Sequence, residues 1–138
     1  MQEKRENAAV MSNEASPKVI LLIDDDEDEH EIFSSALTLV VGSFNFISAR
    51  NCEEGLAILQ ITDPHYIFID VNMPRLNGMI CLEEIKKIER ISHVPVYMYS
   101  TGMNARDGQK ALQLGAIDYI IKPNSISSLS NLLKRILC

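Results

Sequence analysis

The sequence predicts an α/β protein built on a parallel β-sheet, and three observations support this fold class. Short apolar runs alternate along the chain with longer segments whose apolar residues recur at helical spacing, which is typical of repeated βα units. The runs are continuously apolar, as expected of strands that are buried on both faces. Three of them end in charged side chains, at Asp24–Asp25, at Asp70 and at Lys122. Because open α/β sheets bind ligands beyond the carboxyl ends of their strands, these residues are candidates for a functional site.

The first predicted elements follow a polar N-terminal arm. Residues 1–17 lack periodicity and end at Ser16–Pro17, so they are expected to form a flexible arm, and the folded domain is expected to cover residues 18–138. A first strand is predicted at Val19–Ile23. A first helix is predicted to begin near Asp26, and the apolar residues on one of its faces are Ile32, Phe33, Ala36, Leu37 and Val40.

The middle of the chain continues this alternation. Phe44–Ile47 is predicted to be a short strand at an edge of the sheet, and Glu53–Leu59 a helix. Asp63–Pro64 breaks the chain before a third strand, which ends at Asp70. The segment Met73–Gly78 contains a proline and an Asn-Gly pair, which are typical of loops. The helix that follows is expected to direct three apolar residues inward: Leu82, Ile85 and Ile88.

The last part of the chain adds two more strand–helix units. A fourth strand at Val94–Tyr99 leads to Ser100, and a helix over residues 104–114 is expected to stop at Gly115, since glycine commonly follows a helix end. A fifth strand at Ala116–Ile121 leads to Lys122. The last helix begins near Ser125, and its apolar residues are Ile126, Leu129, Leu132, Leu133 and Ile136. Five strands and five helices are thus predicted in one domain.

Composition and charge narrow the classes of function. The chain has 138 residues and a formal net charge of -6, which argues against nonspecific nucleic-acid binding and against an anionic membrane surface as a main partner. No apolar run is long enough to span a bilayer, and the charged N-terminus does not resemble a signal peptide. Cys52, Cys81 and Cys138 show no close spacing, so neither a disulfide nor a zinc site is expected. Reduced cysteines and a cytoplasmic location are predicted.

The charged strand ends have a shared chemistry if their strands meet at one sheet edge. Asp24, Asp25 and Asp70 would repel one another, by about 4 kcal/mol for a pair roughly 4 Å apart at an effective dielectric near 20. Mg²⁺ would remove this repulsion, and it prefers a sparse set of carboxylates, water and phosphate oxygens. Lys122 would add a positive charge and Ser100 a hydrogen bond for the same phosphoryl group. A carboxylate facing Mg²⁺ and lysine can attack phosphorus and form an aspartyl phosphate.

Other polar and aromatic residues are interpreted without a functional role. The acids from Asp26 to Glu31 are expected in the first turns of a helix, where the helix dipole favours negative charge. His30, His65 and His93 are isolated in the sequence and are expected at the surface. The two tyrosines of the fourth strand lie two residues apart, on one strand face, and are interpreted as packing residues: Tyr97 and Tyr99.

Several of these segments together resemble the receiver domain of bacterial two-component response regulators. The resemblance lies in Ile20–Asp28, in Ile69–Gly78, in Pro95–Ser100, in Gly115–Ala116 and in Tyr119–Pro123, and it covers residues 18–138. It implies a flavodoxin-like (βα)5 doubly wound parallel sheet with strand order 2-1-3-4-5. In that order the first and third strands are neighbours, so the adjacent acids Asp24 and Asp25 would meet Asp70.

The resemblance also implies a role for each of the site residues. Asp70 corresponds to the phosphoacceptor, and Asp25 and Asp70 would bind Mg²⁺ directly. Asp24 would hold the ion mainly through water, and the backbone carbonyl of Asn72 would complete the protein ligands. Three further residues match the switch hydroxyl, the aromatic switch residue and the phosphate-contacting lysine: Ser100, Tyr119 and Lys122. The peptide bond between Lys122 and Pro123 is expected to be cis, which proline permits at a cost of roughly 0.5–1 kcal/mol.

A single-domain response regulator is the leading functional hypothesis. The resemblance implies a phosphoryl group taken from a histidine kinase or a phosphotransfer protein, and no catalysis beyond the protein's own phosphorylation and dephosphorylation. The chain ends with the last predicted helix, so the output is expected to go to a downstream protein. The expected contact face combines the helix at 104–114, the strand at 116–121 and the last helix.

Two other classes of function stay open at this point. Asp24-x-Asp26 after an apolar strand is also how haloacid-dehalogenase-type phosphatases begin. Those enzymes have a threonine two residues after the second acid and an acidic pair behind the lysine. Here Asp28 and Asn124–Ser125 occupy the corresponding places. The third possibility is an interaction module that works without phosphorylation, which Mg²⁺ binding would distinguish from a switch.

Overall fold

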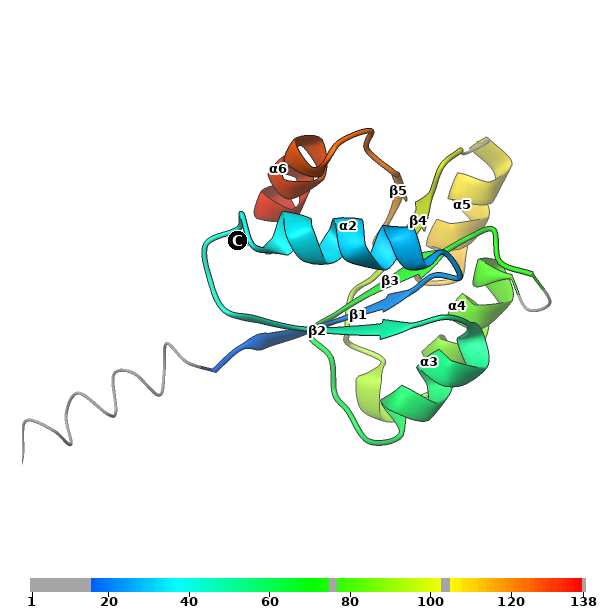
Figure 1. Ribbon diagram of the computed structural model, residues 1–138. Helices are drawn as coiled ribbons and strands as arrows, with labels where there is room; N and C mark the ends of the chain where they lie inside the picture. Colours follow the sequence, from blue (N-terminus) through cyan, green and yellow to red (C-terminus); the bar gives the residue numbers. More distant parts are fainter. Residues whose placement is uncertain (1–15, 75–76, 103–104, 138) are drawn as a thin grey trace, which may run out of the picture.

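Five parallel strands form one sheet at the centre of the molecule. The computed structural model describes residues 16–74, 77–102 and 105–137, so the predicted arm lies outside the described residues except for its last two. The strand order is β2-β1-β3-β4-β5, which confirms the flavodoxin-like topology, with β2 at an edge. Figure 1 shows the sheet between its helices. The strands are β1 (Lys18–Ile23), β2 (Phe44–Ala49), β3 (Tyr66–Asp70), β4 (Val96–Ser100) and β5 (Asp118–Ile121).

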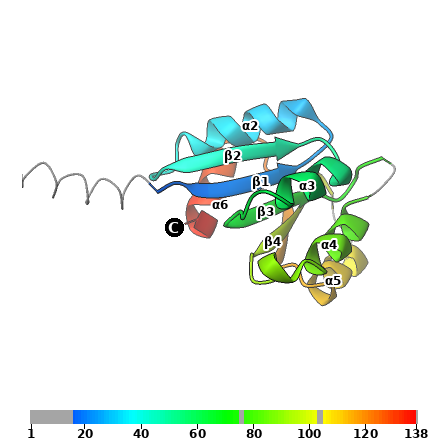
Figure 2. The same cartoon turned by 90° about the horizontal axis from the view of Figure 1, so that it is seen from below.

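Helices cover both faces of the sheet. One face carries α2 (Glu27–Leu37) and α6 (Ile126–Leu137), which pack against each other. The other face carries α3 (Cys52–Leu59), α4 (Gly78–Lys86) and α5 (Ala105–Gln113), as Figure 2 shows from below. A single 3₁₀ turn, η1 (Glu89–Ile91), follows α4. None of the helices in the described ranges has the length and apolar character needed to cross a membrane.

The sheet separates two apolar cores because successive side chains of a strand point to opposite faces. Ile20 and Leu22 belong to the core beneath α2 and α6, whereas Leu21 and Ile23 belong to the core beneath α3 and α4. All four side chains are fully buried. This two-sided burial is the reason that β1 appears in the sequence as an uninterrupted apolar run.

The predicted element bounds are close to those observed. Asp26 caps α2 rather than lying inside it, because its side chain accepts a hydrogen bond from the N–H of Asp28. Val40 lies beyond the end of α2 and is nevertheless buried. Gly115 follows α5 with a φ of 107°, a left-handed conformation that glycine adopts at low cost, so the predicted helix end is confirmed.

The register of the sheet brings the charged strand ends together. β1 pairs with β3 in parallel, and Ile23 lies opposite Ile69. The residues that follow these two, Asp24 and Asp70, therefore leave their strands at the same level of the sheet. β5 lies beside β4 in parallel, so Lys122 emerges at the same edge.

A disulfide bond joins Cys52 in the first turn of α3 to Cys81 in the first turn of α4. The prediction that these cysteines are unpaired was wrong. Their 29-residue separation carries no pairing signal, because only the packing of α3 beside α4 brings their Cα atoms to 5.7 Å, within the usual range for a disulfide. Both side chains are fully buried.

Reduction of this disulfide should destabilise the protein. A crosslink that closes a loop of this length lowers the entropy of the unfolded chain, and its loss should cost about 3–4 kcal/mol of unfolding free energy. Urea unfolding of the wild type with and without dithiothreitol measures the difference. Cys81→Ala should unfold alike in both conditions, and Cys138→Ser should behave as the wild type. A wild type that is indifferent to dithiothreitol would contradict the contribution of the bond.

Candidate functional site

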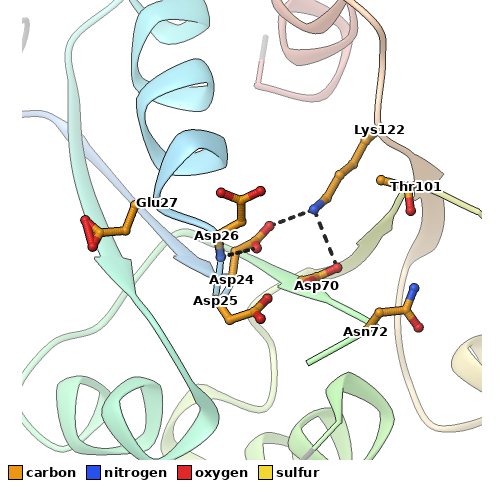
Figure 3. Close-up of a pocket in the computed structure, with 8 residues that line it drawn as sticks. All are labelled: Asp24, Asp25, Asp26, Glu27, Asp70, Asn72, Thr101 and Lys122. Atoms are coloured by element: carbon orange, nitrogen blue, oxygen red, sulfur yellow. Dashed lines mark hydrogen bonds and ion pairs between the residues drawn. The ribbon is translucent and has the colours of Figure 1, made fainter. Parts of the chain in front are cut away.

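A cleft lies at the carboxyl edge of the sheet, where the loops after β1, β3, β4 and β5 meet. Its volume is about 450 Å³. Figure 3 shows the side chains around it, with Lys122 reaching toward two of the carboxylates. The lining residues are Asp24, Asp25, Asp26, Glu27, Asp70, Asn72, Thr101 and Lys122.

Three carboxylates converge in this cleft. Asp24 is fully buried, Asp70 is 5% exposed and Asp25 is open to solvent. One carboxylate oxygen from each residue lies within 4.8 Å of the other two. The sequence-based expectation that these acids meet is therefore confirmed as geometry. Their oxygens are hard ligands at a spacing that one divalent cation can bridge, so the donor set fits Mg²⁺.

Lys122 supplies positive charge to two of these acids. Its Nζ atom lies 2.9 Å from Asp24 Oδ2 and 3.6 Å from Asp70 Oδ1, and its side chain is 9% exposed. Burial alone would lower the pKa of Lys122, but the hydrogen bond and charge of Asp24, together with the charges of Asp70 and Glu29, raise it overall. The ammonium therefore stays protonated and bridges the ends of β1 and β3.

The expectation of a cis peptide bond before Pro123 was wrong, since the described residues contain no cis peptide. Trans is the lower-energy form by roughly 0.5–1 kcal/mol before proline. Lys122 reaches Asp24 and Asp70 from a trans peptide, so the aim of the ammonium does not require the cis form.

Asp70 has a strongly altered acidity. Burial and the nearby charge of Asp24 raise the pKa of Asp70 to about 7, against the lowering effects of Lys122 and of the Asn72 N–H, which hydrogen-bonds the carboxylate. A carboxyl group with a pKa near neutrality in a cleft is typical of a functional residue. The protein holds this acid where ionisation is costly unless further positive charge enters.

The two predicted switch residues, Ser100 and Tyr119, lie next to the cleft in one hydrogen-bonded group. Ser100 is fully buried, and its Oγ accepts hydrogen bonds from Asn72 Nδ2 at 3.2 Å and from the Gly102 N–H at 3.4 Å. The hydroxyl of Tyr119 donates to the Gly102 carbonyl at 3.3 Å, and the ring is 8% exposed. Asn72 thus contacts both Asp70, through its N–H, and Ser100, through its side chain.

His30 is buried, contrary to the expectation that it lies at the surface. Its Nε2 donates a 2.6 Å hydrogen bond to the carbonyl oxygen of Asp24, so it braces the end of β1 against α2. The helical spacing contained this information, because His30 lies three residues before Phe33 and seven before Leu37 on the buried face. His65 and His93 are exposed, as expected.

Gly78 lies directly against the backbone at the end of β3. It is the first residue of α4, and its N–H bonds the carbonyl of Val71 at 3.0 Å. A Cβ atom at this residue would collide with the carbonyl oxygen of Asp70. The absence of a side chain therefore lets α4 begin directly against the backbone that carries the candidate phosphoacceptor.

Comparison with known proteins gives one family. The model of the response regulator receiver domain matches residues 20–134. The chain is 31% identical over 124 residues to the probable transcriptional regulator ycf27 of Cyanophora paradoxa, covering 90% of this chain and 50% of that protein. It spans about half the length of the first curated relatives that it matches.

Solved structures agree with this match. The phosphorylated cyanobacterial phytochrome response regulator RcpA is 26% identical, with a TM-score of 0.79 over 88% of this chain and 91% of that one. The Mn²⁺-bound form of the response regulator Rcp1 is also 26% identical, with a TM-score of 0.75 over 87% of this chain and 91% of that one.

Gly78→Ala should disturb Asp70 specifically. Because the added methyl group meets the backbone of Asp70, we expect a loss of about 1–3 kcal/mol of unfolding free energy. Gly102→Ala is the matched control, since a Cβ there meets nothing within 4 Å. Urea unfolding measures both. Equal stability of the two variants would show that the loop accommodates the methyl group.

The stability of the metal-free protein should depend on the ionisation of Asp70. Its pKa is about 7 in the fold and 3.8 ordinarily, so between these values the folded state binds more protons than the unfolded state. The stabilisation that protonated Asp70 adds to the free energy of unfolding is therefore complete below about pH 4 and is lost as the pH rises through about 7. Asp70→Asn should remove this slope. Thermal unfolding from pH 4 to pH 8 in EDTA tests it, and parallel curves for the two proteins would contradict the raised pKa.

Proposed function

Because the chain belongs to the response regulator receiver family, we propose that it is a signalling switch controlled by phosphorylation of Asp70. The phosphoryl group would come from a histidine kinase or a histidine phosphotransfer protein. The observation that carries the proposal is the placement of the Asp70 carboxylate, which faces two further acids and the Lys122 ammonium in one cleft. This arrangement suits a group that must be a nucleophile and then bear a phosphoryl group.

The phosphorylation step uses the atoms of the cleft directly. An Asp70 oxygen attacks phosphorus, an O–P bond forms, and the N–P bond to the donor histidine breaks, leaving the histidine neutral after it takes up a proton. Lys122 lies 3.6 Å from Asp70 and would contact an oxygen of the transferred group. Charge neutralisation and positioning are the main catalytic effects in such transfers.

The converging acids would hold Mg²⁺, which would supply positive charge to offset the acids and the phosphoryl oxygens. Asp25 and Asp70 would bind it directly, with the backbone carbonyl of Asn72 as a further ligand. Both oxygens of Asp24 are already engaged, one by the Asp26 N–H at 3.0 Å and one by Lys122 at 2.9 Å. This supports a role for Asp24 through water rather than by direct contact.

Ser100 and Tyr119 would carry the signal away from the cleft. Ser100 would turn its hydroxyl toward the phosphoryl group, and the Tyr119 ring would follow. The bond from Tyr119 to the Gly102 carbonyl supports this, because it connects β5 to the segment that leads from β4 to α5.

The face formed by α5, β5 and α6 is proposed as the surface that binds a downstream protein. A groove of about 590 Å³ crosses β5 and α6 and includes Ile121, Pro123 and Leu132. Large apolar side chains are also exposed in α5 and in or next to β5, where Leu112, Ile117 and Ile121 are each more than half exposed. In α5 only Ala111 is buried, so this helix is weakly held and easily displaced.

The family membership argues against a haloacid-dehalogenase-type phosphatase, and we propose no activity beyond the protein's own phosphorylation and dephosphorylation. The net charge of -6 favours protein partners over direct binding to nucleic acid or to an anionic membrane, and a cytoplasmic site of action agrees with a kinase as donor. An interaction module that ignores phosphorylation is the remaining rival. The intact set of acids argues against it.

Asp70 should be the residue labelled by acetyl phosphate in the presence of Mg²⁺, because its carboxylate faces both the proposed metal site and Lys122, whereas both oxygens of Asp24 are already hydrogen-bonded. Intact-mass measurement should show the addition of one phosphoryl group to the wild type and none to Asp70→Asn. The donor without Mg²⁺ is the control. Full labelling of Asp70→Asn would refute the assignment, and an unlabelled wild type would favour the phosphorylation-independent module.

Asp25→Ala should weaken Mg²⁺ binding more than Asp24→Ala. Loss of Asp24, which would act through water, should lower the Mg²⁺ affinity about tenfold, at the lower end of the usual range for such partners. Loss of Asp25, a direct ligand, should lower it more. Calorimetric titration at pH 8, where Asp70 is ionised, measures both. Equal losses would mean that the two acids do not differ in the way their hydrogen bonds suggest.

A further inference from the structure

Tyr99 lies beneath the ammonium group of Lys122. It is the residue before Ser100 in β4, it is 1% exposed, and Lys122 Nζ lies over its ring at 5.4 Å from the centroid. This distance is within the range of a cation–π interaction, which strengthens when the cation is shielded from water. The Lys122 side chain is 9% exposed, so the interaction is largely shielded.

The Tyr99 ring is fixed by two other aromatic residues. Phe33 from α2 meets it edge-on, with centroids 5.9 Å apart and an interplanar angle of 83°. Phe68 from β3 does the same, at 6.3 Å and 79°. Such T-shaped contacts are favourable, and the close packing leaves the ring one orientation. The surface that Tyr99 presents to Lys122 is therefore rigid.

The two ion pairs of Lys122 alone do not explain where its ammonium sits. Nζ is 2.9 Å from Asp24 but 3.6 Å from Asp70, so only the first contact is a hydrogen bond. A flexible lysine held by Asp24 alone could pivot about that bond and leave Asp70. The aromatic face beneath Nζ gives the ammonium a third point of contact, which restricts this movement.

We propose that Tyr99 is a positioning residue that holds Lys122 over the phosphoacceptor. The inference rests on the proposed function, in which Lys122 contacts the phosphoryl group on Asp70. The ring acts through Lys122 and does not touch the phosphoryl group itself. It sets the rate of phosphorylation by keeping the ammonium where the new charge develops.

The phenol stays neutral in this place, so its ring remains a fixed aromatic surface. Burial raises the pKa of Tyr99 well above its usual value, and the charges of Glu29, Asp24 and Asp70 raise it further. The hydroxyl is not required for the contact with Lys122. Phenylalanine at this residue should therefore preserve the effect, whereas an aliphatic side chain should abolish it.

The role predicts opposite behaviour for phosphorylation and for metal binding. Without the ring, Lys122 is less well placed to stabilise the phosphoryl group, so labelling slows. The same freedom lets Lys122 move away from Asp70 while it stays bonded to Asp24. Lys122 then competes less with Mg²⁺ for Asp70, so metal affinity is retained or rises. General damage to the core would weaken both.

Acetyl phosphate labelling and calorimetric Mg²⁺ titration of full-length variants test this. Tyr99→Leu and Tyr99→Met should be labelled about threefold to thirtyfold more slowly than the wild type, the rate equivalent of one shielded cation–π contact. Their Mg²⁺ affinity should be equal to or tighter than that of the wild type. Tyr99→Phe should match the wild type in both measurements.

Tyr97→Leu is the matched control for loss of a tyrosine from the same strand. The Tyr97 ring stacks on Phe68, with centroids 5.2 Å apart. The Tyr97→Leu variant should be labelled at the wild-type rate. Wild-type rates for Tyr99→Leu and Tyr99→Met, or a parallel loss of Mg²⁺ affinity, would overturn the positioning role. An unlabelled wild type would instead count against the proposed function.

Proton NMR of the wild type tests the same contact if the aliphatic variants do not fold. Protons held over an aromatic face are shifted upfield by the ring current. The ε-methylene protons of Lys122 should therefore resonate upfield of those of the exposed lysines, and Tyr99→Phe should keep that shift. A random-coil shift for Lys122 in the folded protein would show that the ammonium does not rest on the ring.

Discussion

The ion pair between Lys122 and Asp24 is the interaction on which the rest of the site depends. It joins the end of β5 to the end of β1 across β3 and β4, and its 2.9 Å contact is almost wholly removed from water. Burying a carboxylate without a partner costs several kcal/mol, so Asp24 could not be fully buried without this ammonium. The same ammonium is only 3.6 Å from Asp70, and one positive charge is thus shared between two acids.

The described acids of the cleft carry more negative charge than Lys122 neutralises, and this imbalance bears on what the cleft can bind. Three carboxylates converge in a cleft where Lys122 pairs with two of them, and burial with the charge of Asp24 holds the pKa of Asp70 near 7 rather than at its ordinary value. Among the described residues that line the cleft, Lys122 is the one cation, so the donor set fits a divalent cation and, in the proposed function, a phosphoryl group that the cation and Lys122 neutralise together. The stability of the fold and the binding chemistry are coupled through the same acid.

Sequence reasoning predicted the sheet and the cleft because their signals are local. Each buried strand is an apolar run, and each candidate site residue follows one directly, so the parallel topology brings Asp24, Asp25, Asp70 and Lys122 to one edge. The features that it missed depend on packing between distant segments. Cys52 and Cys81 meet only because α3 packs beside α4. The cis peptide at Pro123 was expected from the resemblance alone, and Lys122 reaches both acids from a trans peptide. Tyr99 was correctly predicted to be a packing residue. Its contact with Lys122 was not predicted, because it depends on how the Lys122 side chain extends from the end of β5 over β4.

The two faces of the sheet differ in how firmly they hold the site. On the α2 and α6 side, Phe33, Phe68 and Tyr99 form a rigid aromatic group directly beneath Lys122. On the other side, α3 and α4 are tied by a disulfide, but α5 buries only Ala111. Tyr119 and the segment from Ser100 to Gly102 lead to this least secured helix. A charge change at Asp70 can therefore displace α5 at a low free-energy cost. Displacing the aromatic group or the disulfide-linked helices α3 and α4 would cost more. Since motion follows the element with the lowest cost of displacement, this asymmetry gives the proposed signal its direction.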